Sequence, residues 1–180
     1  MKGAVFIALN QMVEEQIGLD SWESLLSTVK PASQGIYISV EDYPDEELFS
    51  LVTTLSEFAN IPMETLVESF GSYLFDVLNS KYPIFSQQQA TFFEFLESID
   101  GVIHKEVKKL YESANLPTLD CERIDDYTMK MVYTSPRKLC LLAEGLIRGA
   151  ARYYQVEYQL THPVCMHKGS DHCELYITVQ

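Results

Sequence analysis

Three side chains that can bind carboxylates occupy every second position of a short polar run. The run is Tyr133, Thr134, Ser135, Pro136 and Arg137. Alternate residues of a strand lie on the same face, so we expect the phenol, the hydroxyl and the guanidinium to project together. Arginine pairs bidentately with carboxylates, and tyrosine and serine add hydroxyl donors. The set would therefore satisfy two neighbouring carboxylates of one ligand.

His104 could complete such a site by binding a metal ion. It borders the apolar stripe of a helical pattern over residues 91–111, so it can face an interior cavity. Haem combines an iron ion with two propionates and would use all four groups. Each residue also has a plainer explanation. The histidine could be a core or surface residue, Ser135 could belong to a turn that ends a strand, and Arg137 could be a surface charge. These explanations account for the residues separately but not for the set.

The composition predicts one folded domain without a nucleic-acid or membrane partner. The chain has 180 residues, 47% of them hydrophobic and 22% charged, which is typical of a globular protein with a sizeable core. The net charge of −13 lacks a basic footprint for nucleic acid and would be repelled by an anionic membrane. The acidic run 41–47 is interpreted as a solvated helix start rather than a partner patch, because carboxylates are favoured near a helix N-terminus.

The sequence shows no export or membrane signal. No apolar run is long enough to span a bilayer. The opening segment 2–9 imitates a signal peptide, but Glu14 and Glu15 follow without a small-residue cleavage site. We therefore expect a cytoplasmic protein, in which the four cysteines would be thiols or metal ligands rather than disulfides.

Hydrophobic periodicity predicts helices followed by a small antiparallel sheet, which is the α+β class. The expected helices cover residues 5–17, 20 or 21 to 30, 44–59, 62–78, a short segment after Pro83, and 91–111. After Pro117, the expected elements are strands over 119–124 and 127–133, a helix over 139–153, and a final strand pair over 154–161 and 173–179. A cofactor would fill the seam between the helical and mixed halves.

An ordered set of residues resembles the haem–nitric oxide/oxygen-binding (H-NOX) family of gas sensors. The set is His104, Pro117, Tyr133, Ser135 and Arg137, in a chain of the family's length that opens Met-Lys-Gly. The Tyr-x-Ser-x-Arg motif alone recurs by chance, whereas the ordered set is specific, and the resemblance covers essentially the whole chain. It implies a single sensor domain with a helical part over about residues 1–60, a haem-binding mixed part over about 61–180, and haem between them.

The resemblance also implies a role for each matching residue. His104 would be the proximal ligand of the haem iron. Tyr133, Ser135 and Arg137 would hold the propionates. Pro117 would press on the macrocycle and keep it distorted, a contact that suits a rigid ring with a fixed φ. Pro117 could equally do no more than begin a strand.

The distal side of the haem would decide which gas binds. A hydrogen-bond donor over the iron favours O2 retention, whereas NO needs no such donor. O2-binding members of the resembled family carry a tyrosine nine residues after the first tyrosine of the motif, and here that position is Leu142. The other expected lining residues are apolar, and core packing would also explain them: Val5, Leu9, Leu74 and Leu78. The pattern favours a sensor of NO that excludes O2, unless Tyr73 or Tyr82 reaches the pocket.

A second cluster of metal-binding side chains lies toward the C-terminus. Its members are Cys140, His162, Cys165 and Cys173, with His167 and His172 as spare donors. Three thiolates and one imidazole form a typical tetrahedral zinc site, and thiolates select zinc over magnesium or calcium. Four protein ligands leave no position for water, so the site would be structural. Some bacterial members of the resembled family carry a matching zinc site.

Two alternatives to structural zinc remain open. Cys140 could be a buried helix residue, with the other three residues in a loop by chance. Zinc-bound thiolates could also be redox-active, since oxidation can eject the metal and form a disulfide. Cys121 has no nearby partner in the sequence and is expected in the core.

These patterns lead to one expected function and two alternatives. The expected protein binds haem b, senses NO, also takes CO, and is not an enzyme, because the sequence contains no catalytic constellation. By resemblance, NO weakens the bond between the iron and His104, and the resulting shift regulates a histidine kinase or a cyclic-di-GMP enzyme. The alternatives are a zinc-stabilised adaptor that senses thiol oxidation and an O2-binding haem protein.

Overall fold

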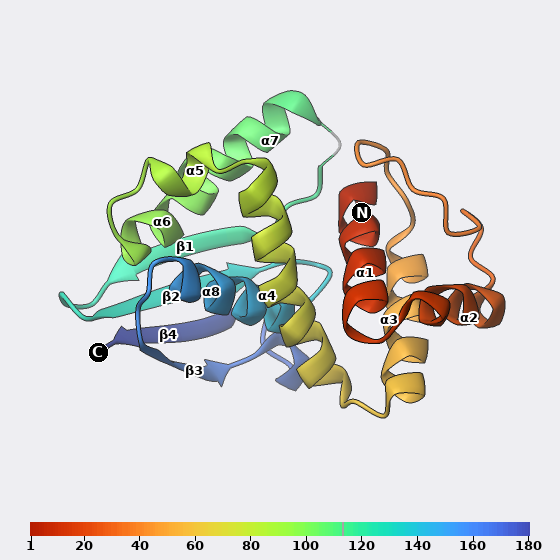
Figure 1. The fold of residues 1–180 in the computed structure, drawn as a ribbon. Helices are drawn as coiled ribbons and strands as arrows, with labels where there is room; N and C mark the ends of the chain where they lie inside the picture. The colour runs from red at the N-terminus through yellow and green to blue at the C-terminus, as the bar shows by residue number, and fades with distance from the viewer. Residues whose placement is uncertain (113) are drawn as a thin grey trace.

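The computed structural model describes residues 1–112 and 114–180, in which a helical part lies beside a mixed part (Figure 1). The helical part contains α1 (Gly3–Gln16), α2 (Leu19–Val29) and α3 (Asp45–Ala59). The long helix α4 (Met63–Lys81) lies between the two parts. Leu74 of α4 packs into the core of the helical part, and Phe75 packs into the core of the mixed part. Helix α4 therefore belongs to both cores.

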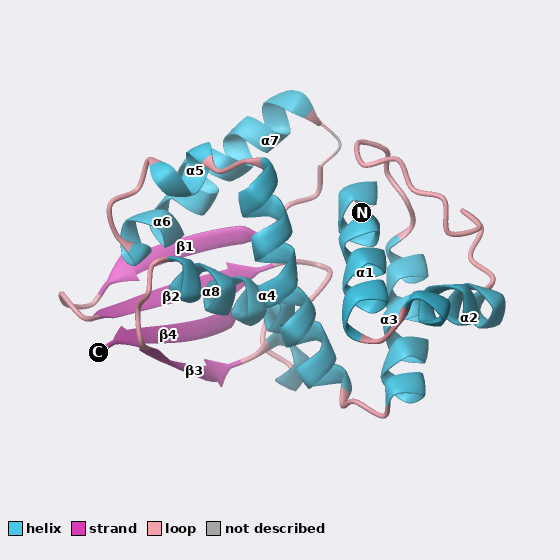
Figure 2. Cartoon of the chain, viewed as in Figure 1, coloured by secondary structure: helices cyan, strands magenta, loops and turns pink. Residues whose placement is uncertain are grey.

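The mixed part contains a four-stranded antiparallel sheet with helices packed on it (Figure 2). Its strands are β1 (Thr118–Arg123), β2 (Thr128–Thr134), β3 (Tyr158–Val164) and β4 (Cys173–Val179), in the order β1-β2-β4-β3. Its helices include α5 (Ile84–Gln87), α6 (Phe92–Ser98) and α8 (Cys140–Tyr153). Buried residues of α6 and α8 share one core with the inward residues of β2 and β4. The α+β class and both strand pairs are confirmed.

The third strand differs from the prediction. It covers Tyr158–Val164 rather than residues 154–161, because the chain turns through Gln155 at φ 56° after the predicted end of α8 at Tyr153. The strand also runs past Pro163, with a register shift between Thr161 and Val164. Proline is tolerated there because β3 is an edge strand, where a missing N–H breaks no inner ladder.

The predicted continuous helix over residues 91–111 is interrupted. Helix α6 starts at a capping box in which the Thr91 hydroxyl accepts from the Glu94 N–H and the Glu94 carboxylate accepts from the Thr91 N–H. A π-helical turn, η1 (Ile99–Ile103), then precedes α7 (His104–Leu110). A π turn holds an extra residue and rotates every later side chain about the axis. The apolar stripe therefore does not continue, and Leu110 is 75% exposed.

Helices α4 and α8 cross at two glycines. A Cβ on Gly145 of α8 would overlap the Glu68 carbonyl of α4, and a Cβ on Gly71 would overlap the Leu142 carbonyl. Only glycine permits backbones to approach this closely. The contact fixes α8, which begins at Cys140, against α4.

The acidic helix start at α3 is only partly solvated, which corrects its interpretation from the sequence. Glu47 is buried and accepts a hydrogen bond of 2.7 Å from the Tyr37 hydroxyl. Asp45 is ion-paired with the N-terminal ammonium. The carboxylates at the start of α3 therefore bind Tyr37 and the N-terminus of the chain. Among the described residues, no helix is long and apolar enough to cross a membrane.

Candidate functional site

His104 is the first residue of α7 and directly follows the π turn. Its backbone N–H donates to the Ile99 carbonyl, which is a π-type hydrogen bond. Its Nδ1 lies 3.0 Å from Oδ1 of Asp100, and its side chain is 13% exposed. Histidines that bind metals through one ring nitrogen usually donate the other to a carboxylate or a carbonyl. The Asp100 contact therefore leaves Nε2 of His104 as the atom suited to a metal.

The Tyr-x-Ser-x-Arg run does not lie on one strand face, so that prediction is wrong for its last two members. Strand β2 ends at Thr134, and a turn follows, closed by a 3.1 Å hydrogen bond from the Lys138 N–H to the Ser135 carbonyl. The Ser135 hydroxyl accepts from the Arg137 N–H at 3.2 Å. Proline at position 136 ends the strand ladder. A turn, rather than strand alternation, brings these groups together.

Arg137 already binds one carboxylate in this structure. Its Nε donates to Asp45 of α3, and its Nη1 donates to the Asn115 carbonyl. Burial would raise the pKa of the Asp45 carboxyl, but the Arg137 guanidinium and the N-terminal ammonium outweigh it and hold that pKa below its ordinary value. Pro117 is half-buried two residues beyond Asn115, immediately before β1. The guanidinium thus sits where α3, the residues before β1 and the turn after β2 converge.

Tyr133 points into the mixed part. It lies opposite Leu119 and Cys173 in the sheet and is fully buried. Its hydroxyl accepts a hydrogen bond of 3.1 Å from the Leu139 N–H, and burial raises the pKa of the phenol. The ring packs in one cluster with Cys140, at the start of α8, and with Cys165 and Cys173. Tyr133 therefore connects the Arg137 turn to the cysteine cluster.

Four of the five predicted apolar lining residues touch one core. Leu9 and Leu74 are buried in the core of the helical part, and Val5 and Leu142 are half-buried against it. Leu78 differs, since it is 37% exposed on the last turns of α4. These residues come from α1, α4 and α8, so the apolar set spans both parts of the fold.

Tyr73 and Tyr82 were the two tyrosines that could have supplied a hydrogen-bond donor to bound O2, and neither has a buried hydroxyl without a partner. The Tyr73 hydroxyl donates to the Glu15 carboxylate at 2.8 Å. Burial and the Glu15 carboxylate raise the pKa of Tyr73 to about 12, which keeps this phenol protonated. Tyr82 is exposed.

The C-terminal cysteines and one histidine form a compact group of potential metal ligands. The ligand atoms of Cys140, His162, Cys165 and Cys173 all lie within 4.8 Å of one another. The Sγ atoms of Cys140 and Cys165 are 4.0 Å apart. Burial, together with the neighbouring sulfurs, raises the pKa of Cys140, so its thiol is protonated in the absence of a cation. The sequence prediction that these four residues come together is consistent with this geometry.

His162 is oriented toward the three sulfurs. Its Nδ1 lies 2.7 Å from Oε1 of Glu144, while its Nε2 is buried and has no hydrogen-bond partner among the described residues. A buried imidazole nitrogen without a partner is costly, and a metal ion would remove that cost. The spare donors lie elsewhere, since His167 contacts the Lys138 carbonyl and His172 contacts Asp171. All four cysteines are free thiols, and burial raises the pKa of half-buried Cys121 to about 12.

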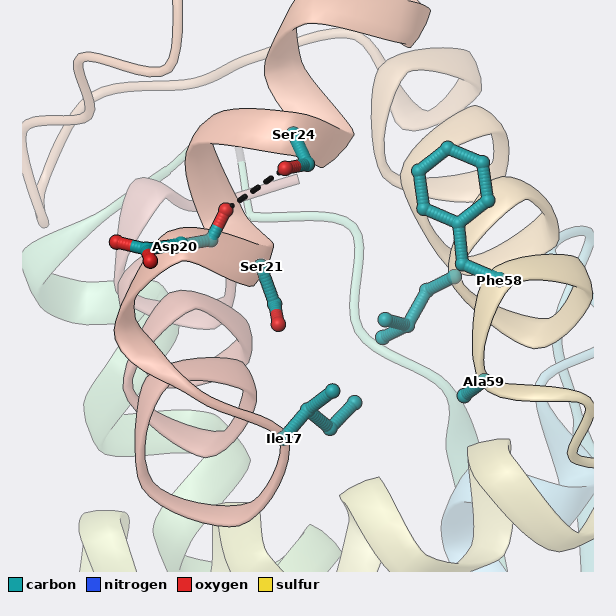
Figure 3. Close-up of a pocket in the computed structure, with 7 residues that line it drawn as sticks. Ile17, Asp20, Ser21, Ser24, Phe58 and Ala59 are labelled. Carbon is teal, nitrogen blue, oxygen red and sulfur yellow. Dashed lines mark hydrogen bonds between the residues drawn. The ribbon is translucent and has the colours of Figure 1, made fainter.

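Two surface depressions lie outside the predicted haem residues. The first is an open hollow between the end of α1, the start of α2 and the end of α3, lined partly by Ile17, Ser21 and Phe58 (Figure 3). The hydrogen bond drawn there runs from the Ser24 hydroxyl to the Asp20 carbonyl within α2. The second is polar and includes Glu144, the partner of His162.

Sequence reasoning missed three acidic residues that contact the proposed ligands. Asp100 lies four residues before His104, a spacing that could have been recognised on a helix. Asp45 and Glu144 are 92 and 18 residues away from their partners, Arg137 and His162, and no local pattern identifies them.

The fold and its family place this chain in the class of haem-binding gas-sensor domains. The profile of the family described as Haem-NO-binding matches residues 2–162. The chain therefore belongs to this family, whose members are also known as H-NOX proteins. The family binds haem, and its domains are sensors rather than catalysts.

Solved structures show the same fold. An H-NOX protein from Shewanella oneidensis in the Fe(II)NO state is 38% identical, with a TM-score of 0.94 over 100% of this chain and 99% of that chain. An unliganded Fe(II) H-NOX protein from K. algicida is 25% identical, with a TM-score of 0.91 over 100% and 97% of the two chains. A curated relative, soluble guanylate cyclase gcy-35 of Caenorhabditis elegans, is 24% identical across 99% of this chain. The chain spans only 26% of that relative.

Proposed function

We propose that this protein is a haem b sensor of NO that excludes O2 and regulates a signalling partner. The observation that carries the proposal is His104, whose ring is held through Nδ1 by Asp100 with Nε2 left for iron. Haem supplies reversible binding of a diatomic gas at ferrous iron. We further propose one domain in which residues 1–60 form the helical part and residues 61–180 form the haem-binding part.

The residues around His104 fit the chemistry of haem. Arg137 sits in a partly buried position and binds a carboxylate, which is the group that a propionate presents. Ser135 would support the propionates from the turn, and Tyr133 would do so from the end of β2. Half-buried Pro117 would contact the macrocycle. The apolar face of the cofactor would meet Val5, Leu9, Leu74, Leu78 and Leu142.

The exclusion of O2 rests on three described residues, Leu142, Tyr73 and Tyr82, none of which presents a free buried donor. Leu142 offers no hydrogen bond at the position where O2-binding members carry a tyrosine. The Tyr73 hydroxyl is occupied by Glu15. Ferrous haem in an apolar pocket retains O2 poorly, whereas NO and CO bind without a donor.

NO binding would reach a partner through the helix that carries His104. His104 would hold the iron, and NO binding would weaken that bond and leave α7 with its π turn free to shift against the sheet. We propose a histidine kinase or a cyclic-di-GMP enzyme in the cytoplasm as the recipient. The guanylate cyclase relative combines a similar region with a much longer chain, which supports signalling as the output.

We also propose that Cys140, His162, Cys165 and Cys173 bind one zinc ion. The partnerless Nε2 of His162 and the three nearby sulfurs fit a tetrahedral site. Zinc would tie the start of α8 to β3 and β4. A redox role is the second candidate, favoured by the 4.0 Å separation of the Cys140 and Cys165 sulfurs, because oxidation to a disulfide would expel the metal.

One spectroscopic experiment tests the main proposal. Visible absorption of the reduced protein is recorded under nitrogen, CO, NO and air. We expect a haem spectrum that changes with CO and NO and gains no stable oxygenated form in air. A colourless protein after haem reconstitution would reject the proposal, and a persistent oxygenated spectrum would reject the exclusion of O2.

A further inference from the structure

The π turn η1 holds an acidic side chain beside His104. Asp100 is the second residue of the turn, and its Oδ1 lies 3.0 Å from Nδ1 of His104. The two side chains are respectively 40% and 13% exposed, so the carboxylate is partly hydrated while the imidazole is largely buried. The contact joins the π turn to the first residue of α7.

The π turn is a short interruption between α6 and α7, and such turns are rare in helices. Helices contain π turns mostly as single-turn insertions, often at functional sites. Here α6 precedes the turn and α7 follows it, so the turn alone sets how α7 is rotated relative to α6. Gly101 within the turn has open space around the position of a Cβ, so close packing does not explain the glycine. The rotation set by the turn determines which side chains lie beside His104, and Asp100 is one of them.

The charge on Asp100 acts toward the sheet as well as toward His104. Burial raises the pKa of Cys121 in β1 to about 12, and the carboxylates of Glu97, Asp120 and Asp100 add to this rise. Asp100 therefore lies close to β1, the strand that the π turn contacts. The Asp100 carboxylate is in direct contact with the His104 imidazole and is not a remote surface charge.

We propose that Asp100 is a positioning residue that sets the strength of the bond between His104 and the haem iron. A carboxylate that accepts the Nδ1 proton of an imidazole fixes the tautomer and increases the basicity of Nε2. His104 would then hold iron more tightly and resist release when NO binds. This inference rests on the proposed role of His104 as the iron ligand.

The expected magnitude is moderate. Loss of such an outer partner commonly costs about 10–100-fold in metal affinity. Because Asp100 is 40% exposed, water screens part of its effect, and we expect the lower end of this range. Asp100→Ala should increase the rate of haem loss roughly tenfold. Asp100→Asn keeps an acceptor oxygen without the charge, so its effect should be smaller.

The test measures the iron–histidine stretching frequency of the reduced protein by resonance Raman spectroscopy. We expect the band to move to lower frequency in the order wild type, Asp100→Asn, Asp100→Ala. We also expect His104 to be released faster after NO addition, as read from the Soret band. Glu106→Gln is the matched control, since Glu106 lies on α7 and pairs with Lys109 rather than with His104.

The outcomes separate this inference from the proposed function. If the wild-type protein shows an iron–histidine band and all three variants leave it unchanged, the role of Asp100 is rejected and the ligand assignment survives. If the wild-type band is absent, or persists in His104→Gly, the ligand assignment itself fails. Equal frequency shifts in Glu106→Gln and Asp100→Asn would show that any lost negative charge near α7 has the same effect. That result would also reject the proposal.

Discussion

Arg137, in the turn after β2, is ion-paired with Asp45, the first residue of α3. The same carboxylate lies 2.8 Å from the N-terminal ammonium. The guanidinium proposed to hold a haem propionate therefore already joins the mixed part of the fold to the helical part. A propionate would bind an arginine that Asp45 already holds in place. A displacement of the propionate would therefore be transmitted through Arg137 to α3.

Replacing this arginine should loosen haem without removing its iron ligand. Charge-assisted hydrogen bonds contribute about 1.5–3 kcal/mol, so Arg137→Ala should speed haem loss by roughly one to two orders of magnitude. The absorption bands that report ligation by His104 should stay near normal. Transfer of haem to an acceptor protein measures the rate. Arg123→Ala, which removes a surface pair with Glu97, is the control, and equal rates in the two variants would contradict the assigned role.

The Asp45 carboxyl should make stability depend on acid pH. Its pKa is lowered in the folded state, so its contribution is present above the ordinary pKa of 3.8 and is lost as pH falls through the lower folded value. Asp45→Asn should therefore be less stable than wild type at neutral pH, with the difference shrinking below about pH 4. Denaturant unfolding across this range measures it. Asp20→Asn, at an exposed site on α2, should leave the profile unchanged, and a constant deficit in Asp45→Asn would exclude titration as the cause.

His104→Ala should abolish stable haem binding unless free imidazole is supplied. The substitution removes the only histidine on α7, and imidazole can enter the space left by the ring. Absorption spectra after reconstitution, with and without imidazole, provide the measurement. His167→Ala should bind haem normally, because that ring contacts the Lys138 carbonyl. A normal five-coordinate ferrous spectrum in His104→Ala without imidazole would show that another residue ligates the iron.

A donor at position 142 should create affinity for O2. Leu142→Tyr places a phenol on α8 where the half-buried leucine now contacts the core. The ferrous variant should show a longer-lived oxygenated spectrum than wild type, with little change in CO binding. Leu142→Phe has similar bulk without a hydroxyl. An oxygenated form of equal lifetime in both variants would attribute the effect to volume rather than to hydrogen bonding.

Protein purified under reducing conditions should contain about one zinc ion per chain. Peroxide should release the zinc and consume thiols, because thiolates bind metal only when reduced and deprotonated. The raised pKa of Cys140 requires zinc to displace its proton, so affinity should fall as pH is lowered. Metal analysis with thiol titration measures both. Cys121→Ala should retain zinc, and stoichiometric zinc in a double Cys165→Ala, Cys173→Ala variant would reject the site.

Local patterns in the sequence determined the element types and many of the candidate residues. Apolar spacing predicted the helices now observed as α1 to α4, and β propensity predicted the strand pairs. Helix and strand periods are short-range properties, so a single sequence carries them. The His-x2-Cys-x7-Cys spacing with one upstream cysteine likewise predicted the group that the fold gathers, namely Cys140, His162, Cys165 and Cys173.

Only the tertiary structure decided which polar groups meet. The π turn before His104 breaks a periodicity that the sequence continues without interruption, because a rotation of one helix depends on what each half packs against. The Ser135 hydroxyl and Arg137 are joined by a turn instead of a strand, since ladder pairing stops at Thr134. Long-range pairs such as Arg137 with Asp45 and His162 with Glu144 require elements distant in sequence to be packed together, which periodicity does not encode.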